Sequence, residues 1–278
     1  MIGRPSPWFD LVRHVTLLAG AAVMLAPFVW MTVTSFKPPH EIFAAELTLL
    51  PRQWHAYENY REAFTKVPML RYLLNGAIVT SAIFALQVLV AVPCAYALAK
   101  LDFRGRGLIF AMVLLGILIP SHVPAIPLYI MLWQVKLLNT YAALVIPFVI
   151  SVFGIFLMRQ FFKTVPDELI QAARLDGLSE FAIVWRIMVP AAMPAVISFG
   201  IFSVVAHWND YFWPLLVINS RELAPPPLGV AYFRNEEAGH DYGPLMAGAV
   251  IIIAPLVLAF LAAQRRFIEG MTMTGLKG

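Results

Sequence analysis

The sequence has few charged residues for its length. Asp, Glu, Lys and Arg make up 13% of the 278 residues, about half of their usual share in a soluble domain, and hydrophobic residues make up 60%. This length would suit one or two soluble domains, but so apolar a composition excludes them. The formal net charge of +4 is not gathered into a dense basic cluster, so we expect no nucleic-acid partner.

Residues that carry catalytic or metal chemistry are also scarce. Cys94 is the single cysteine and lies within an apolar run, so no internal disulfide can form. No phosphate loop of the form G-x-x-x-x-G-K-[ST] occurs, so we do not expect this chain to hydrolyse ATP. No Cys/His cluster has metal-ligand spacing, and the apolar runs offer no catalytic set of carboxylates or histidines. We therefore expect a chain that is not an enzyme and holds no cofactor or metal.

What the sequence does have is six long apolar runs. A helix needs about 20 apolar residues to cross a bilayer, and backbone groups cannot stay unpaired in lipid, so each run should be a helix. The sequence thus predicts an all-α integral membrane protein with one transmembrane domain over residues 1–278. The expected spans are about residues 14–36, 72–99, 107–135, 137–158, 187–209 and 242–264. Kinks or breaks are predicted at the prolines within or beside these runs, which are Pro93, Pro120, Pro124, Pro127, Pro147 and Pro255.

The distribution of positive charge predicts the orientation. With the N-terminus inside, 12 of the 20 Lys and Arg residues fall in inner segments and eight in outer ones. This excess follows the positive-inside rule and predicts that both termini are cytoplasmic. The first apolar run is longer than that of a cleavable signal peptide, so we expect it to be retained as a span.

One inner loop, residues 164–186, has marked helix signals. Pro166 suits a first helical position, and Asp167 and Glu168 follow in a first turn that favours negative charge. Gly177 suits a left-handed stop, and Ser179 suits the N-cap of a second short helix. A loop with two capped helices from residue 166 to 186 is expected to dock another protein. The alternative is an amphipathic segment that lies on the membrane surface.

The faces of the first loop helix indicate how it would dock. Leu169, Ala172, Ala173 and Asp176 are expected to share one side. The two alanines remove bulk, so another surface could approach the backbone closely.

These loop residues have the form of a known motif. In permeases of binding-protein-dependent ABC importers, a cytoplasmic loop reads E-A-A, three residues, G, nine residues, then I-x-L-P. Here Gln171-Ala172-Ala173 and Gly177 have the same spacing, and the match ends at Pro190, with Gln for Glu and Val for Leu. The loop therefore resembles the ATPase-coupling loop of that family. The residues that the resemblance assigns to coupling are Glu168, Gln171, Ala172, Ala173, Asp176, Gly177 and Pro190.

Nearly the whole chain is similar to the maltose-type carbohydrate-uptake group, and specifically to the smaller, six-span partner of its two permeases. The similar stretches are residues 34–38, 59–60, 71–75, 95–99, 208–214 and 270–278. The resemblance implies the type I ABC importer permease fold in a bacterial inner membrane, with a coupling helix. It implies as partners a second permease, two ATPase subunits that carry ATP and Mg, and a periplasmic or lipid-anchored binding protein.

The same resemblance implies roles for further segments. The outer loop before the last span, residues 219–241, would probe the binding protein, and the tail at residues 275–278 would reach the ATPase. Gln171 stands where the family usually has Glu, so Asp176 or Glu168 would have to supply a charge.

A few polar residues within the spans are candidates to line a solute pathway. Polar groups at membrane depth tend to face a cavity, and the candidates are Asn75, Gln87, His122, His207, Asn209 and Asp210. Trp208, Tyr211 and Trp213 could stack on a sugar ring. The alternative is that these aromatic residues belong to an interfacial belt.

The sequence therefore predicts a permease subunit that moves a sugar or sugar-like solute by alternating access. One alternative is the same architecture for a non-sugar solute such as a glycerophosphodiester. Another is a protein of a different class, a standalone secondary transporter or an integral membrane enzyme.

Overall fold

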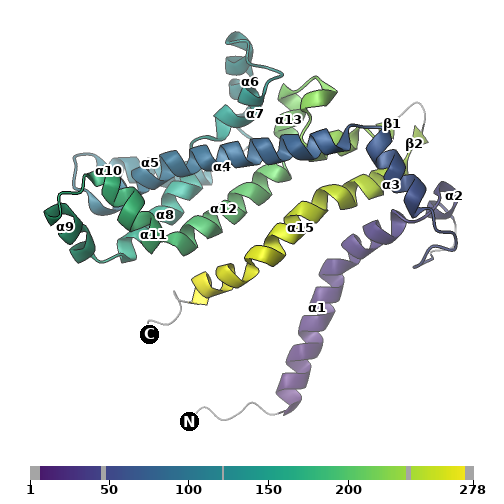
Figure 1. Ribbon diagram of the computed structural model, residues 1–278, viewed down its shortest axis with the longest axis horizontal. Helices are drawn as coiled ribbons and strands as arrows, with labels where there is room; N and C mark the ends of the chain where they lie inside the picture. Colours follow the sequence, from purple (N-terminus) through teal and green to yellow (C-terminus); the bar gives the residue numbers. More distant parts are fainter. Residues whose placement is uncertain (1–6, 45–47, 121, 236–238, 273–278) are drawn as a thin grey trace. The chain divides into compact units, whose positions relative to one another are not determined.

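The computed structural model describes residues 7–44, 48–120, 122–235 and 239–272 (Figure 1). Within these residues the regular secondary structure is helical apart from one antiparallel pair of two-residue strands, β1 (Arg234–Asn235) and β2 (Gly239–His240). The longer helices are α1 (Pro7–Thr34), α4 (Met69–Lys100), α5 (Arg106–Leu118), α8 (Val152–Thr164), α12 (Met193–Trp208) and α15 (Tyr242–Thr272). The shorter elements are α2 (Pro39–Ile42), α3 (Ala56–Thr65), α6 (Ala125–Gln134), α7 (Tyr141–Val145), η1 (Ile146–Phe148), α9 (Asp167–Leu175), α10 (Glu180–Ile183), η2 (Val184–Met188), α11 (Val189–Ala191), α13 (Phe212–Val217), η3 (Arg221–Leu223) and α14 (Pro226–Ala231). The predicted all-α class is confirmed.

Three described helices, in α1, α4 and α15, are long and apolar enough to cross a membrane. Two further pairs would do so if each bent pair counts as one span. One pair, residues 141–148 with α8, bends by 44°, and the other, residues 180–191 with α12, bends by 84°. The described residues thus hold three to five candidate spans by length and composition.

The predicted span over residues 107–135 does not form one helix. It is divided into α5 and α6, which have 13 and 10 residues. Ile119 ends α5 with an extended backbone, as a residue before proline prefers, because the ring of Pro120 disfavours the helical conformation there. Pro124 then stands at the N-cap of α6. The breaks predicted at Pro120 and Pro124 are therefore present and divide this run, whereas Pro93 and Pro255 lie within α4 and α15, which continue through them.

The chain divides into two compact units, residues 1–69 with 230–254 and residues 70–229 with 255–278. In the first unit, α1 buries none of its most apolar stretch. The unit is held together beside α3, where the buried Asn59 amide donates to the carbonyls of Ser35 and Lys37, each at 2.9 Å.

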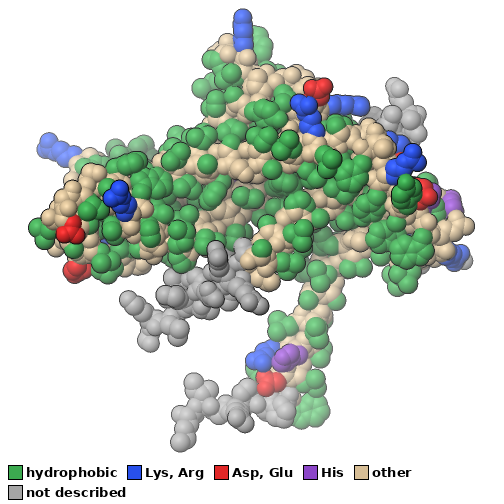
Figure 2. Space-filling view, in the orientation of Figure 1, with side chains coloured by type: hydrophobic (Ala, Val, Ile, Leu, Met, Phe, Trp, Pro, Cys, Tyr) green, Lys and Arg blue, Asp and Glu red, His purple; other side chains and the backbone are tan. Residues whose placement is uncertain are grey.

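In the second unit, α8 packs against α5 and α12. A buried cluster joins α4, α8 and the loop that follows it, with Tyr96, Met158, Phe162, Ile170 and Ile183 among its members. Over these helices hydrophobic side chains cover much of the visible face, while charged side chains gather at loops and helix ends (Figure 2). An apolar exterior of this kind suits contact with lipid or with other apolar helices.

Candidate functional site

The loop between α8 and α12 has the capped helices that its sequence predicts. α9 begins at Asp167, so Pro166 stands just before the first helical residue rather than at it. Gly177 has φ +80°, and its N–H donates to the carbonyl of Arg174 at 3.0 Å. The N–H of Leu178 donates to Ala173 at 3.0 Å, which completes a Schellman ending. The Ser179 hydroxyl then accepts the N–H of Ala182 and caps α10.

The faces of α9 differ in part from the prediction. Ile170 and Ala173 are buried, with 3% and 5% of their surface exposed, and both belong to the core cluster beneath the loop. Ala173 is therefore packed against the protein's own interior and cannot meet a partner, because the larger Ile170 decides which side turns inward. Leu169 and Ala172 do face outward. The other predicted coupling residues, Glu168, Gln171, Asp176, Gly177 and, in α11, Pro190, are also exposed.

Two sets of polar contacts, made by Lys100 and by Tyr96, hold this loop against the end of α4. The Lys100 ammonium, with only 8% of its side chain exposed, donates to the Val165 carbonyl at 2.6 Å and to the Asp167 carboxylate. The Tyr96 hydroxyl donates to Glu180 Oε2, and Arg174 Nε donates to Glu180 Oε1 at 2.7 Å. A displacement of α9 would therefore be transmitted to α4 through bonds to buried groups.

The charge of Glu180 is set by these contacts. Hydrogen bonds from Arg174 and then from Tyr96 hold the pKa of the Glu180 carboxyl below its ordinary value. The same pairing raises the pKa of the Arg174 guanidinium. Both side chains are close to half exposed, so solvent screens this ion pair and its contribution to stability is modest.

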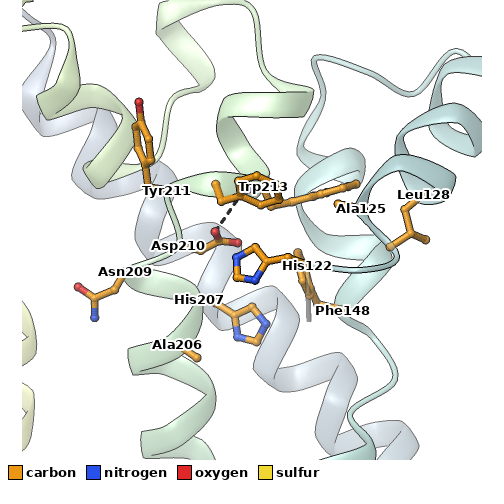
Figure 3. Close-up of a pocket in the computed structure, with 11 residues that line it drawn as sticks. His122, Ala125, Leu128, Phe148, Ala206, His207, Asn209, Asp210, Tyr211 and Trp213 are labelled. Carbon is orange, nitrogen blue, oxygen red and sulfur yellow. Dashed lines mark hydrogen bonds between the residues drawn. The ribbon is translucent and has the colours of Figure 1, made fainter. Parts of the chain in front are cut away.

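The predicted pathway residues lie mainly around one pocket in the second unit. It has a volume of about 530 Å³, within the range of roughly 300–1,000 Å³ usual for small-molecule sites (Figure 3). His122, His207, Asn209 and Asp210 line this pocket, as do Tyr211 and Trp213 from the predicted aromatic set. Sequence reasoning missed Phe148 and Phe212, which complete the wall with Ala125, Leu128 and Ala206. No signal in the sequence near Phe148 points to this position, because only the bend between η1 and α8 brings it to the pocket.

Asn75 and Trp208 do not line this pocket. The Asn75 side chain is fully buried and donates to the carbonyls of Glu222 and Ala224 at 2.9 and 3.0 Å, while it accepts the Tyr141 hydroxyl at 2.6 Å. These bonds use both amide hydrogens and the amide oxygen, so Asn75 ties α4 to η3 and α7. Trp208 is 7% exposed. Asn75 lines a separate pocket together with Arg71 and Tyr141, and the pathway role of Asn75 and Trp208 stays a prediction.

The walls of the pocket are fixed by hydrogen bonds from behind. The buried Gln87 amide donates to the Phe148 carbonyl at 2.9 Å and accepts the Ser203 hydroxyl at 2.6 Å. The Trp213 indole donates to the Ala143 carbonyl at 2.9 Å. The Phe148 ring packs edge-on against both His207 and Trp213, with centroids 5.0 and 6.1 Å apart. The pocket is therefore preformed in this structure rather than assembled from mobile side chains.

Apolar helices of membrane-crossing length, a capped loop tied to their ends and a preformed pocket define an integral membrane transport component. The chain belongs to the family of binding-protein-dependent transport system inner membrane components, whose model matches residues 87–272. It is therefore a permease subunit of an importer rather than an enzyme. Such an importer works with a binding protein and with an ATPase.

Several curated relatives match over almost the full length. An arabinooligosaccharides transport system permease, AraQ of Halalkalibacterium halodurans, is 32% identical over 99% of each chain. A diacetylchitobiose uptake permease, NgcG of Streptomyces coelicolor, is 30% identical over 93% of this chain and 86% of the relative. The sn-glycerol-3-phosphate permease UgpE of Escherichia coli is 30% identical over 95% and 96%.

Solved structures share the fold. A chain of a bacterial ABC transporter involved in import of the acidic polysaccharide alginate superposes with a TM-score of 0.83 at 23% identity, covering 96% of this chain and 99% of that one. A chain of the alginate transporter in complex with a periplasmic protein gives 0.59 at 14% identity, over 95% and 99%. The predicted type I importer permease fold is confirmed. The predicted ATPase contact of residues 275–278 lies outside the described residues.

Proposed function

We propose that this chain forms half of the translocation pathway for a sugar or sugar-like solute, paired with a second, different permease subunit. The proposed solute class is supported by the similarity of this chain to two oligosaccharide permeases, AraQ and NgcG, which is extensive in both length and identity. Two ATPase subunits on the cytoplasmic side, with their ATP and Mg, would drive the pair, and a binding protein would deliver the solute.

The unburied first helix supports a second permease. None of the most apolar stretch of α1 is buried, and Trp8 and Met24 are each 75% exposed. Lipid tails and a neighbouring helix are both apolar, so hydrophobicity alone does not favour one contact over the other. A second permease would add close van der Waals packing against α1. The two permeases would then enclose the pathway between them.

The capped loop supports the proposed site of ATPase docking. The exposed residues Glu168, Gln171 and Ala172 belong to α9, and Asp176 caps its end. Lys100 of α4 binds Asp167, the first residue of this helix. A partner that binds this surface and moves would displace α4. The core cluster that α4 shares with α8 and α12 would pass the displacement on to those helices. With this loop inside, both termini are cytoplasmic, which a reporter fused after Gly278 would test: activity restricted to the periplasm would contradict it.

The direct test is purification of the tagged chain from its native membrane in mild detergent, followed by mass spectrometry. We expect one subunit with a phosphate loop and one further permease to co-purify in stable ratio, and ATP-dependent uptake of a neutral oligosaccharide after reconstitution with the binding protein. A chain that purifies without an ATPase yet transports on its own would be a secondary transporter.

The second candidate function is uptake of a phosphorylated polyol. It is favoured by the similarity to UgpE, which is as extensive as that to the oligosaccharide permeases. Ligand binding by the partner binding protein would separate the two solute classes.

A further inference from the structure

The polar centre of the pocket is made by three side chains. Asp210, His122 and His207 lie next to one another in the wall, and the rings of Phe148 and Trp213 lie around them (Figure 3). Asn209 and Tyr211 also line the pocket, but their polar ends point away from this centre (Figure 3). A solute that enters this pocket would therefore meet Asp210 and the two imidazoles.

The hydrogen-bonding roles of two of these groups are fixed by their neighbours. His207 Nδ1 lies 2.7 Å from the carbonyl oxygen of Ser203, and a carbonyl only accepts, so Nδ1 carries the hydrogen. The other ring nitrogen of the neutral imidazole, Nε2, is then an acceptor. Asp210 Oδ1 accepts the backbone N–H of Trp213 at 3.2 Å, and the backbone N–H of Phe212 also bonds to this carboxylate, whose remaining lone pairs can accept from a solute.

This arrangement offers acceptors, a negative charge and no fixed positive charge. Lys and Arg are absent from the described lining of the pocket. A phosphate or carboxylate presents acceptor oxygens and a negative charge, so it would be repelled by the Asp210 carboxylate and would find no donor at Nε2 of His207. A hydroxyl group donates, and neighbouring hydroxyls on a sugar could satisfy Asp210 and His207 together.

The apolar part of the lining suits the same ligand. Phe148, Phe212 and Trp213 give the pocket aromatic walls, and Phe212 lies edge-on to His122 with centroids 4.7 Å apart. Aromatic faces pack against the C–H faces of a sugar ring, while the hydroxyls at its edge reach the polar centre. A small cation could also approach Asp210 and the rings, so it must be tested beside the sugar.

We infer that this pocket is a solute subsite in this chain itself, selective for neutral, hydroxyl-rich solutes and closed to phosphorylated ones, with Asp210 and His207 as its specificity-determining residues. The inference rests on the proposed permease function. It narrows that function, because it favours neutral sugars over phosphorylated polyols as the solute. It also places solute contacts in this chain rather than in its permease partner alone.

The test is saturation-transfer NMR on the intact importer complex in lipid nanodiscs. The probes are maltotriose, cellotriose and xylotriose as neutral sugars, glycerol 3-phosphate and glucose 6-phosphate as anions, and choline as a cation. We expect saturation transfer to at least one neutral sugar and none to the anions. Asp210→Asn keeps an oxygen for the Trp213 N–H but loses the charge, and should weaken sugar binding by about tenfold, as loss of a hydrogen bond to a charged group implies.

His207→Phe should weaken the same sugar to a similar extent, whereas Ser198→Ala, on α12 outside the pocket, should leave its binding unchanged. Signals from no neutral sugar, stronger signals from an anion or from choline, or sugar binding unaltered by Asp210→Asn and His207→Phe would each overturn the inference. Co-purification of the ATPase in the same preparation tests the permease function separately. A failure of the proposed solute subsite can therefore be distinguished from a failure of the proposed permease function.

Discussion

Tyr96 and Glu180 lie 84 positions apart in the sequence and are joined by a hydrogen bond from the tyrosine hydroxyl to the carboxylate. Tyr96, near the end of α4, is 2% exposed, while Glu180 stands at the start of α10 in the loop between α8 and α12. The bond thus connects the exposed surface of this loop with the buried side of a helix long enough to cross a membrane. Arg174, in the last turn of α9, binds the same carboxylate and brings both loop helices into the connection.

Tyr96→Phe should remove the hydrogen bond to Glu180 without leaving a cavity in the core. The ring stays, and the lost bond to a charged group is worth about 1.5–3 kcal/mol, reduced here because Glu180 is near half exposed. We expect fewer solute molecules transported per ATP hydrolysed, with membrane insertion unchanged. Uptake and ATP hydrolysis measured together in proteoliposomes give this ratio, and an unchanged ratio would show that the bond does not transmit force.

Lys100→Met should be more damaging than Asp167→Asn. Lys100 has 8% of its side chain exposed and binds the Val165 carbonyl, whereas the Asp167 side chain is 70% exposed and readily hydrated. Removing the ammonium leaves a part-buried carbonyl unsatisfied, at a cost of about 1–3 kcal/mol. Transport should fall severalfold for Lys100→Met and change little for Asp167→Asn. Equal losses of transport in the two variants would show that the ion pair of Lys100 with Asp167, not the contact with the Val165 carbonyl, supports transport.

The loop between α8 and α12 should become less ordered in acid. Because its native contacts hold the pKa of Glu180 below the ordinary value of 4.5, the carboxylate stabilises the loop above that pH and loses this effect as pH falls through the lowered native value. Hydrogen-exchange protection factors for residues 174–183 should be flat near neutrality and decline below about pH 4.5.

Glu180→Gln is the matched control for the acid response. It removes the titrating group, so the decline in protection specific to this pair should vanish. A decline that persists in the variant would assign the acid response to other carboxylates.

Gly154→Ala should disturb the packing of α8 on α12. A Cβ at this position would lie 2.4 Å from the ring of Phe199, which is 2% exposed and packs against Phe84 and Phe153. Overpacking of this kind destabilises by about 1–3 kcal/mol. Gly107→Ala on α5 is the control, since nothing lies within 4 Å of its Cβ. We expect a lower melting temperature in detergent for the first variant alone, and equal values would refute close contact at Gly154.

The sequence allowed prediction of features that depend on near neighbours. The two ends of α9 follow from Asp167 and Gly177, and the start of α10 follows from Ser179, because the effects of these residues on the backbone are local. The buried face of α9 could not be predicted in the same way. A nine-residue helix with small apolar residues on several sides shows no preferred face until the core beneath it is known, and that core turns Ile170 and Ala173 inward.

The pocket shows the same limit at longer range. Residues 207–213 stand out in the sequence as a polar and aromatic cluster, and most of them do line it. Phe148 comes from a bend about 60 positions earlier that Gln87 holds in place through its carbonyl. A contact between residues so far apart leaves no trace in local composition, hydropathy or turn chemistry.

The ATPase is proposed to drive this permease by binding the loop around Gly177, and replacement of that glycine tests this proposal most directly. Gly177 and Gly105 both have positive φ, +80° and +88°, and both have open space where a Cβ would lie. Tryptophan at either position carries the same backbone strain of about 1–2 kcal/mol, but only the one at 177 would obstruct the proposed docking surface.

The measurement is ATP-dependent uptake by Gly177→Trp and Gly105→Trp complexes, normalised to the amount inserted in the membrane. We predict that Gly177→Trp inserts normally but loses uptake and bound ATPase by about tenfold or more, while Gly105→Trp retains both. Normal uptake by the Gly177→Trp complex, or equal losses in the two variants, would contradict ATPase coupling through this loop.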